Sequence, residues 1–427
     1  MTTGGIAGPR SERVILVGMR RPRRPPSEVE EHLEELARLT ETAGGTVVGS
    51  FVQEKPRREP ATAVGKGKVQ EIAAAREELR SGLVIFDEDL TPAQVRNLER
   101  ALEVTVLDRA GLILDIFARR ARSREAKVQV ELAQLRYLLP RLTRRWSHLE
   151  RQVGGIGVRG VGETQLELDR RLVQQRIAHL VRDLSRIEGE RRERRKRRVA
   201  RTTKVALVGY TNAGKSTLLN RLTGADAGVE DRLFATLDPL VRQGKEAWSD
   251  FLFIDTVGFI RKLPPQLVAS FRSTLEEARD ADLLLHLVDL SHAGFEDQMK
   301  TTLQVLKETK LDDRPVVTVF NKVDRLPDGA AAQGARSLWP DALFISATRG
   351  DGLEDLRCAV EEALGEGTVL GQAALPPGAG SVIARIHSLA EVLGSRFVDG
   401  KVEIRYRARR EEAGILARLI QKSGGRG

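Results

Sequence analysis

Short apolar runs alternate with amphipathic segments along the first hundred residues of the chain. The runs at 14–18, 46–51, 83–87 and 104–108 have the length of buried strands. The segments near 28–43, 67–80 and 92–102 place apolar residues at helical spacing instead. Alternation of strands and helices predicts a small α/β layered domain over residues 1–118.

The next part of the chain, residues 119–204, has a helical period throughout. One apolar stripe consists of Val128, Leu132, Leu135, Leu139, Leu142, Trp146 and Leu149, and a second of Leu166, Val173, Ile177, Leu180, Leu184 and Ile187. Between the stripes lies GGIGVRGVG, residues 154–162, whose five glycines a helix interior does not tolerate cheaply. We predict two helices that fold back as an antiparallel hairpin with a glycine-rich tip.

Beyond the hairpin, the pattern predicts a larger α/β domain and then a smaller domain. Apolar strands are expected at 204–208, 251–255, 316–320 and 343–346, in a doubly wound, mostly parallel sheet over residues 205–372. A linker, ALPPGAG at 374–380, precedes residues 381–423, which we interpret as strand, helix, strand, helix. Residues 373–427 are therefore predicted to contain a small α+β C-terminal domain.

Composition excludes several classes of protein. The chain has 427 residues, 41% hydrophobic but only 4% aromatic, and its longest apolar run, 283–288, is interrupted by His286. No run approaches the roughly 20 residues that a membrane span needs. Cys358 is the only cysteine, so no internal disulfide can form, and the histidines show no zinc-binding spacing. With no secretory signal at its N-terminus, the chain is expected to be cytoplasmic.

The net charge of +10 is concentrated in one segment. Residues 1–118 contain 17 basic and 19 acidic residues (−2), 119–204 contain 25 and 10 (+15), 205–372 contain 18 and 26 (−8), and 373–427 contain 10 and 5 (+5). A solvated helix surface is one explanation for the basic hairpin, but such surfaces ordinarily mix both signs. Binding to a polyanion such as RNA explains the imbalance better.

A phosphate-binding motif follows the hairpin directly. The sequence GYTNAGKST lies between an apolar strand and a helical segment, which is the context of a P-loop. Its glycines let backbone N–H groups curl around phosphates, and the helix N-terminus adds the positive end of its dipole. The predicted nucleotide contacts here are Gly209, Tyr210, Thr211, Asn212, Ala213, Gly214, Lys215, Ser216 and Thr217, with Lys215 on the β/γ-phosphates and Ser216 on Mg²⁺.

Three further motifs each follow a predicted strand. Asp255-Thr256-Val257-Gly258 offers a carboxylate that can hold Mg²⁺ through water and a glycine N–H that can sense the γ-phosphate. Asn321-Lys322-Val323-Asp324 offers a carboxylate, Asp324, that can accept hydrogen bonds from N1–H and the 2-amino group of guanine. Ser346-Ala347-Thr348 can cradle the guanine carbonyl. The predicted base is therefore guanine, and these four motifs resemble those of P-loop GTPases.

Hydrolysis needs groups that close on the γ-phosphate. We expect Thr236, in the segment Phe234-Ala235-Thr236-Leu237-Asp238, to contact Mg²⁺ and GTP, although a surface-loop threonine is the alternative. Lys215, Thr236 and Gly258 form the predicted catalytic set, and Ser216, Thr236 and Asp255 the predicted metal set.

One position departs from the pattern of Ras-like GTPases. Phe259 follows the DTVG glycine, where those enzymes have a glutamine that orients the attacking water. A phenyl ring cannot do this, so we predict slow intrinsic hydrolysis that a partner, a cation or another side chain accelerates. Asn212 resembles the asparagine that coordinates K⁺ in cation-stimulated GTPases, although it can also simply stabilise the loop.

The flanking regions resemble those of the HflX GTPases. The resemblance rests on GKGKVQEI (65–72), on DEDLTPAQVRNLERAL, VLDRAGLILDIFARRARSREAKVQVELAQL and RYLLPRL within 83–142, and on RGVGETQLELDRR (159–171). It covers about residues 12–372. Val161 stands where the family usually has proline, and Ser-Ala-Thr varies a position often held by lysine or leucine, neither of which affects the expected nucleotide binding.

This resemblance implies a ribosome-associated GTPase. The expected partner is the large (50S) ribosomal subunit and its rRNA, and the implied role is splitting or rescue of ribosomes under stress. The expected RNA contacts at the hairpin tip are Arg159, Gly154, Gly155, Gly157, Gly160 and Gly162, with Arg159 stacking on or bonding to an exposed base unless it is simply a solvated loop residue. A monomer without DNA specificity is expected.

Alternative interpretations remain open at this point. The basic hairpin could remodel RNA while the nucleotide only regulates it, and a membrane-linked regulatory GTPase is a third class, which the lack of a lipidation signal disfavours. In the N-terminal domain, GKGK at 65–68 could bind phosphate, although an exposed turn is the better interpretation, and no P-loop there supports ATP binding.

Overall fold

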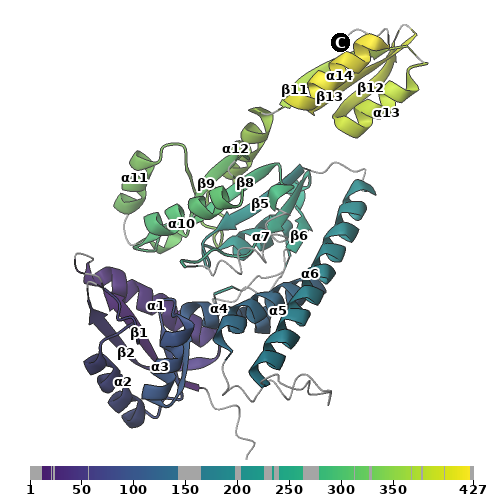
Figure 1. The fold of residues 1–427 in the computed structure, drawn as a ribbon. Coiled ribbons are helices and arrows are strands. Elements are labelled where there is room, and N and C mark those ends of the chain that lie inside the picture. The colour runs from purple at the N-terminus through teal and green to yellow at the C-terminus, as the bar shows by residue number, and fades with distance from the viewer. Residues whose placement is uncertain are drawn as a thin grey trace, which may run out of the picture. The chain divides into compact units, whose positions relative to one another are not determined.

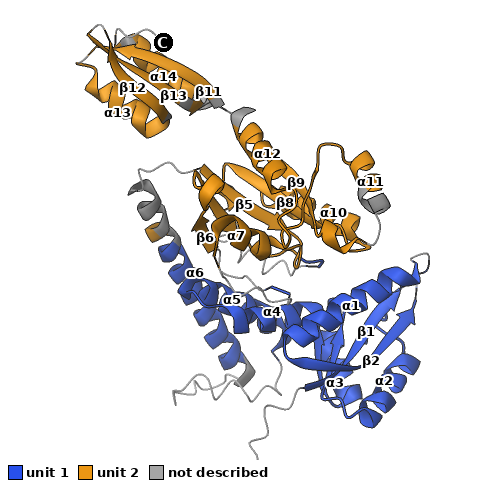
Figure 2. Ribbon diagram, turned by 180° about the vertical axis from the view of Figure 1, so that it is seen from behind, with its two compact units in different colours: residues 1–188, 230–238, 260–273 blue, residues 189–229, 239–259, 274–427 orange. Residues whose placement is uncertain are grey.

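The fold is known from a computed structural model that describes most of the chain. The described residues are 12–20, 22, 25–55, 57–142, 165–197, 203–225, 233–234, 240–262, 278–311, 313–326, 329–366, 368–376, 378–398 and 400–423. They form two compact units (Figure 2): unit 1 contains residues 1–188, 230–238 and 260–273, and unit 2 contains 189–229, 239–259 and 274–427. None of the described helices is long and apolar enough to cross a membrane.

The N-terminal part of unit 1 is a four-stranded parallel sheet with helices in each crossover (Figure 1). Its elements are β1 (Glu12–Arg20), α1 (Pro26–Thr42), β2 (Gly45–Glu54), α2 (Lys66–Glu78), β3 (Leu83–Phe86), α3 (Pro92–Leu102) and β4 (Thr105–Asp108). All seven match the predicted elements to within a few residues. The lysines of GKGK lie in the first turn of α2 and not in an exposed turn, so that interpretation was wrong.

The strand order of this sheet, β2-β1-β3-β4, makes it doubly wound. The chain first winds from β1 to β2, then crosses to the other side of β1 and continues through β3 to β4. The reversal places a switch point between β1 and β3, and in open α/β sheets the carboxyl ends of the strands at such a point border a ligand crevice. Asp87 follows β3 there, and its N–H donates to the carbonyl of Val17 in β1 at 2.9 Å.

The helical part of unit 1 contains α4 (Arg109–Arg120), α5 (Arg124–Leu138) and most of α6 (Gln165–Arg197), whose residues from 189 on belong to unit 2. Helix α4 runs through the predicted boundary at 118/119: its buried residues end at Phe117, but the helix continues to Arg120. Within the predicted stripes, Leu132, Leu142, Val173 and Leu180 are buried. Arg176 on α6 forms a bidentate ion pair with Glu131 on α5, at 2.7 and 2.9 Å. The hairpin tip, with Trp146 and Leu149, lies outside the described residues.

Unit 2 contains a six-stranded sheet of order β10-β9-β8-β5-β7-β6, in which only β6 is antiparallel to its neighbour. The strands are β5 (Thr203–Gly209), β6 (Leu240–Gln243), β7 (Phe251–Asp255), β8 (Leu283–Asp289), β9 (Val316–Asn321) and β10 (Leu343–Phe344), and the helices are α7 (Lys215–Thr223), α10 (Phe295–Glu308), α11 (Gly329–Leu338) and α12 (Leu353–Glu366). The doubly wound, mostly parallel sheet is confirmed. Strands β6 and β8 were not predicted.

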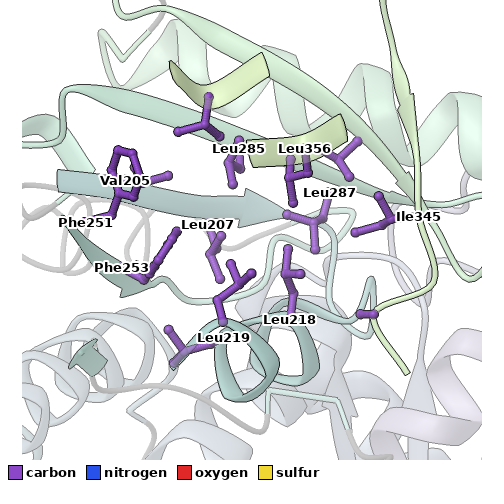
Figure 3. Close-up of a cluster of buried hydrophobic side chains, with 14 of the residues drawn as sticks. Val205, Leu207, Leu218, Leu219, Phe251, Phe253, Leu285, Leu287, Ile345 and Leu356 are labelled. Atoms are coloured by element: carbon purple, nitrogen blue, oxygen red, sulfur yellow. The ribbon is translucent and has the colours of Figure 1, made fainter. Parts of the chain in front are cut away.

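One face of this sheet carries the main hydrophobic core of the domain (Figure 3). Alternate residues of the central strands, such as Val205 and Leu207 of β5 and Leu285 and Leu287 of β8, lie in one cluster with side chains of α7 and α12. The cluster fixes the beginning of α7 beneath the end of β5. The core therefore holds the P-loop, which connects these two elements, in a defined place.

The C-terminal domain corrects the sequence prediction. Its elements are β11 (Thr368–Leu375), α13 (Gly380–Leu389), β12 (Glu391–Val398), β13 (Lys401–Arg409) and α14 (Arg410–Lys422), in an antiparallel sheet of order β11-β13-β12. The predicted boundary at 372/373 falls within β11, and the first two residues of the predicted linker at 374–380 are the last two of that strand. The segment predicted as the first strand after 381 is helix α13, because Val382, Ile383 and Ile386 lie at helical spacing and pack on the sheet.

His286, in the centre of β8, is buried, and neither of its ring nitrogens has a hydrogen-bond partner among the described residues. Burial, reinforced by the charge of Lys215, lowers its pKa from 6.5 to about 4. Protonation therefore favours the unfolded chain, so stability is unaffected above pH 6.5 and falls between pH 6.5 and 4. We expect His286→Leu to raise the free energy of unfolding by about 1–3 kcal/mol.

The measurement for His286→Leu is urea unfolding of the full chain at pH 7.5 and pH 5, followed by a probe within unit 2. The increase in the free energy of unfolding, relative to the wild type, should be larger at pH 5 than at pH 7.5. Only the wild type has His286, whose protonation opposes folding. His387→Leu, at a position outside this sheet, is the control. A variant that is less stable than the wild type at both pH values would contradict the prediction.

Candidate functional site

The loop between β5 and α7 has the geometry of a phosphate cradle. Gly214, directly before α7, has φ +92°, and a Cβ there would come within 2.2 Å of the Asn321 amide. Gly209 has φ +152°, and a Cβ there would meet the backbone oxygen of Leu287 at 2.3 Å. Both glycines are therefore required by close packing as well as by conformation. Asn212 has φ +62°, which asparagine tolerates better than most residues, so loop conformation alone accounts for this residue type.

Lys215 is held inside this loop by its own backbone. Its Nζ donates to the carbonyls of Gly209 at 3.1 Å and Tyr210 at 2.8 Å, and the side chain is buried. Burial lowers its pKa from 10.5 to about 8; the carboxylate of Asp255 opposes this shift and the charge of Lys322 adds to it. The amine is thus fixed where the motif predicts the β/γ-phosphates to bind.

Two of the predicted metal ligands are brought together. The hydroxyl of Ser216 donates to Oδ2 of Asp255 at 2.8 Å, and Asp255 is fully buried at the end of β7. A hydroxyl and a carboxylate are hard oxygen donors of the kind that Mg²⁺ prefers, with phosphate oxygens and water completing its octahedron. The donor set therefore fits Mg²⁺. The third predicted ligand, Thr236, lies outside the described residues.

The residues after Asp255 lie across the P-loop. The hydroxyl of Thr256 donates to the carbonyl of Leu207 at 2.7 Å, so this side chain anchors the strand end. The backbone of Phe259 bonds on both sides, its N–H to the carbonyl of Gly209 at 3.0 Å and its carbonyl to the N–H of Thr211 at 2.7 Å. The ring of Phe259 is buried, which agrees with a position that does not orient water.

The base end of the site is built around Asn321, which is buried. Its Nδ2 donates to the carbonyl of Ala213 at 2.9 Å, and its Oδ1 accepts from the N–H of Ala347 at 3.0 Å. One amide side chain thus joins the P-loop to the Ser-Ala-Thr loop. The Ala347 N–H, which belongs to the predicted cradle for the guanine carbonyl, thus already donates to the side chain of Asn321. The motif alone does not indicate this contact.

Two further contacts orient the neighbouring side chains. Lys322 Nζ donates to Asp289 Oδ2 at 2.7 Å, and the hydroxyl of Ser346 donates to Asp324 Oδ1 at 2.6 Å. Ser346 thereby fixes the carboxylate that is predicted to recognise guanine. Asp289 was missed by sequence reasoning, although it ends an apolar run just as Asp255 and Asn321 end theirs, and that shared pattern could have identified it.

Several predicted site residues are not placed with the others. Ala235, Thr236, Leu237 and Asp238, and at the hairpin tip Arg159 and Gly154, Gly155, Gly157, Gly160 and Gly162, lie outside the described residues. Phe234 belongs to unit 1, where its buried ring packs edge-on against Phe117 with centroids 4.5 Å apart. This ring contact is a packing contact.

Comparison with known families covers most of the chain. Residues 30–118 match the family described as GTP-binding GTPase N-terminal, residues 120–198 the GTP-binding GTPase Middle Region, and residues 204–322 the 50S ribosome-binding GTPase. The succession agrees with an α/β domain, a helical region and a P-loop domain.

Curated relatives extend this similarity to more than four fifths of the chain. The GTPase HflX of Flavobacterium psychrophilum is 46% identical over 376 residues, 83% of this chain and 91% of the relative, and that of Escherichia coli is 44% identical over 365 residues, 85% and 86%. A solved structure, the SsGBP and GDP complex, is 26% identical with a TM-score of 0.47 and covers 83% of this chain and 99% of its own. The P-loop geometry and the curated relatives together show a GTP-hydrolysing enzyme, and the chain belongs to the HflX family of GTPases.

Proposed function

We propose that this GTPase binds the large (50S) ribosomal subunit and acts as a ribosome-splitting or rescue factor controlled by GTP. The observation that carries the proposal is the match of residues 204–322 to a family described as 50S ribosome-binding GTPase. The relatives are named for their GTPase activity, so the ribosomal partner and the splitting role are our inference. The working place of such a factor is the cytoplasm.

Helix α6 supports an RNA partner. Its sequence contains eleven arginines and lysines against six acidic residues, and Arg170, Arg171, Arg176, Arg182 and Arg186 are exposed. A helix of 33 residues that carries these exposed arginines offers a long surface to RNA phosphates. We propose that the hairpin contacts rRNA, with Arg159 and the tip glycines Gly154, Gly155, Gly157, Gly160 and Gly162 at its far end.

The nucleotide roles complete the proposal. We assign the phosphates and Mg²⁺ to residues 209–217 with Asp255 and Gly258, guanine to residues 321–324 and 346–348, and the switch role to Thr236 within 234–238. When bound, Mg²⁺ neutralises charge on the β- and γ-phosphates. The chain's own residues bind and orient: Lys215 holds the phosphates, Asp324 selects the base, and Gly258 follows the γ-phosphate. Phe259 cannot orient the attacking water, so a K⁺ ion at Asn212 or a ribosomal group provides the missing catalytic contribution.

The test is GTP turnover of the full chain titrated with purified 50S subunits at several salt concentrations. We expect 50S subunits to raise turnover, and the triple variant R170Q/R182Q/R186Q to weaken binding and reduce the slope of log affinity against log salt by about 2. GTP affinity without ribosomes should not change. R80Q/R96Q/R100Q, three exposed arginines of the N-terminal domain, is the matched control.

In a second series of the same experiment, structured RNA without ribosomal protein replaces the 50S subunits. If RNA alone raises turnover and 50S subunits neither bind nor stimulate, the enzyme is an RNA-remodelling protein and the ribosomal proposal is wrong. If the slope of log affinity against log salt is the same for both triple variants, α6 is not part of the interface with the ribosome.

A further inference from the structure

The sheet of the C-terminal domain has one face that its helices do not cover. Ile404 and Tyr406 of β13 are buried on the other face, in one cluster with Ile386 of α13 and Leu416 of α14. Successive residues of a strand point to opposite faces of a sheet. The residues that alternate with this buried set therefore form a separate surface, which neither α13 nor α14 shields from solvent.

We call this surface the open face, and its described residues include Leu370, Gln372, Arg396, Glu403 and Arg405. The strand register places Gln372 opposite Arg405 and Arg396 opposite Glu403. Leu370 is 68% exposed, and the side chain of Arg396 is 71% exposed. Because all three strands contribute residues, the open face spans the sheet.

The open face is cationic. Nε and Nη2 of Arg396 both lie 2.8 Å from Oε2 of Glu403, and since a guanidinium has five N–H donors, Arg396 keeps donors for a further acceptor. Arg405 is exposed and forms no ion pair within the described part of the chain. The surrounding segment, residues 373–427, has ten basic and five acidic residues. These charges favour a polyanionic partner.

Single-stranded RNA matches this surface better than a duplex or a bilayer does. The grooves of a duplex are entered by a protruding helix or ribbon, whereas the open face is a broad sheet surface. Binding to a bilayer needs an apolar surface, and the residues of the open face are mainly charged and polar. Unpaired bases can pack on Leu370 and on the planes of guanidinium groups while the phosphates accept their N–H donors.

We propose that the open face binds single-stranded RNA, with Arg396 and Arg405 on the phosphates, Leu370 against a base and Gln372 beside the base edges. This surface belongs to a different domain from α6. The contact therefore goes beyond the ribosomal role proposed above and does not require it.

The test measures binding of a short fluorescein-labelled single-stranded RNA to the full chain by fluorescence anisotropy at several salt concentrations. We expect R396Q/R405Q to weaken binding about tenfold and to reduce the slope of log affinity against log salt by about 1.4, because two phosphate contacts are lost. The charge-conserving variant R396K/R405K should keep the slope of the wild type. Leu370→Ala should weaken binding about threefold without changing the slope, because it removes only an apolar contact.

The matched control is R385Q/R418Q, which removes two exposed arginines from α13 and α14 of the same domain. It should bind RNA about as tightly as the wild type. Equal losses in the two double variants would mean that only net charge matters, and would overturn the role of the open face. Repeating the series in the R170Q/R182Q/R186Q background should give the same ratios, because α6 and the open face are separate contacts.

Titration with 50S subunits distinguishes RNA from protein as the partner. If R396Q/R405Q binds 50S subunits less tightly but binds single-stranded RNA as the wild type does, the open face contacts a ribosomal protein and the RNA assignment is wrong. If 50S subunits bind none of the variants while RNA binding still depends on Arg396 and Arg405, the ribosomal proposal fails and the open face stands as an RNA surface.

Discussion

Asp324→Asn is expected to weaken binding of GTP and GDP by about 100-fold or more, because two charge-assisted hydrogen bonds to guanine are lost. The amide that replaces the carboxylate presents an N–H₂ group, which repels the 2-amino donor of guanine. Xanthine carries a carbonyl at that position and can accept a hydrogen bond from the amide. The variant should therefore prefer xanthine nucleotides over guanine nucleotides.

Competition experiments measure this preference: GDP and xanthosine diphosphate (XDP) are compared for their ability to displace a labelled nucleotide from the variant. The hydroxyl of Ser346, which donates to Oδ1 of Asp324, can still donate to the one oxygen that the substituted amide keeps. The loop therefore retains its contact, and the change is confined to base recognition. Asp341→Asn, on the exposed surface nearby in sequence, is the matched control. Unaltered selectivity for guanine in Asp324→Asn would refute the role given to the NKVD motif.

Arg109→Met is expected to cost unit 1 about 3–5 kcal/mol, because it leaves Glu35 and Asp87 buried beside one another without their shared cation. Arg109, the first residue of α4, is the centre of a buried cluster: it donates to Glu35 at 2.5 Å and to Asp87 at 2.8 Å. Its side chain is 1% exposed, so solvent does not screen the loss. Lys262, which also pairs with Asp87, and Arg261, which also pairs with Glu35, compensate only in part, since both are more exposed than Arg109.

Hydrogen exchange at the amides of β1 and β3 reports this cost, since it measures opening of unit 1 without requiring the whole chain to unfold as one unit. Arg119→Met is the control: it lies on the same helix, but its side chain is 63% exposed and forms an ion pair with Asp115, whose side chain is 47% exposed. Similar protection in Arg109→Met and Arg119→Met would contradict the importance of the buried cluster.

Strands buried on both faces were the easiest elements to predict, because a parallel sheet imposes continuous apolar runs. Strand β8 has such a run, but His286 interrupts it, and no strand is predicted there. In the C-terminal domain, β-branched residues favoured a strand where packing selects helix α13. Intrinsic preference is too weak to decide such short segments.

The P-loop, DTVG, NKVD and SAT motifs could be read from the sequence because each carries its chemistry in a few consecutive residues. Contacts that join distant segments could not. Asp289 binds Lys322 from another strand, and the cluster of Arg109 draws on α1, β3, α4 and the segment after DTVG. Nothing in the local sequence of Arg109 distinguishes it from the many exposed arginines of the chain.

The amide of Asn321 joins the loop that receives the phosphates to the loop that receives the base. Both loops therefore lose much of their conformational entropy when the protein folds, and little remains to be lost when the nucleotide binds. A ligand that engages only one end, such as guanosine or pyrophosphate, meets a site already shaped at the other. Affinity for the intact nucleotide then reflects preorganisation as much as the number of contacts it makes.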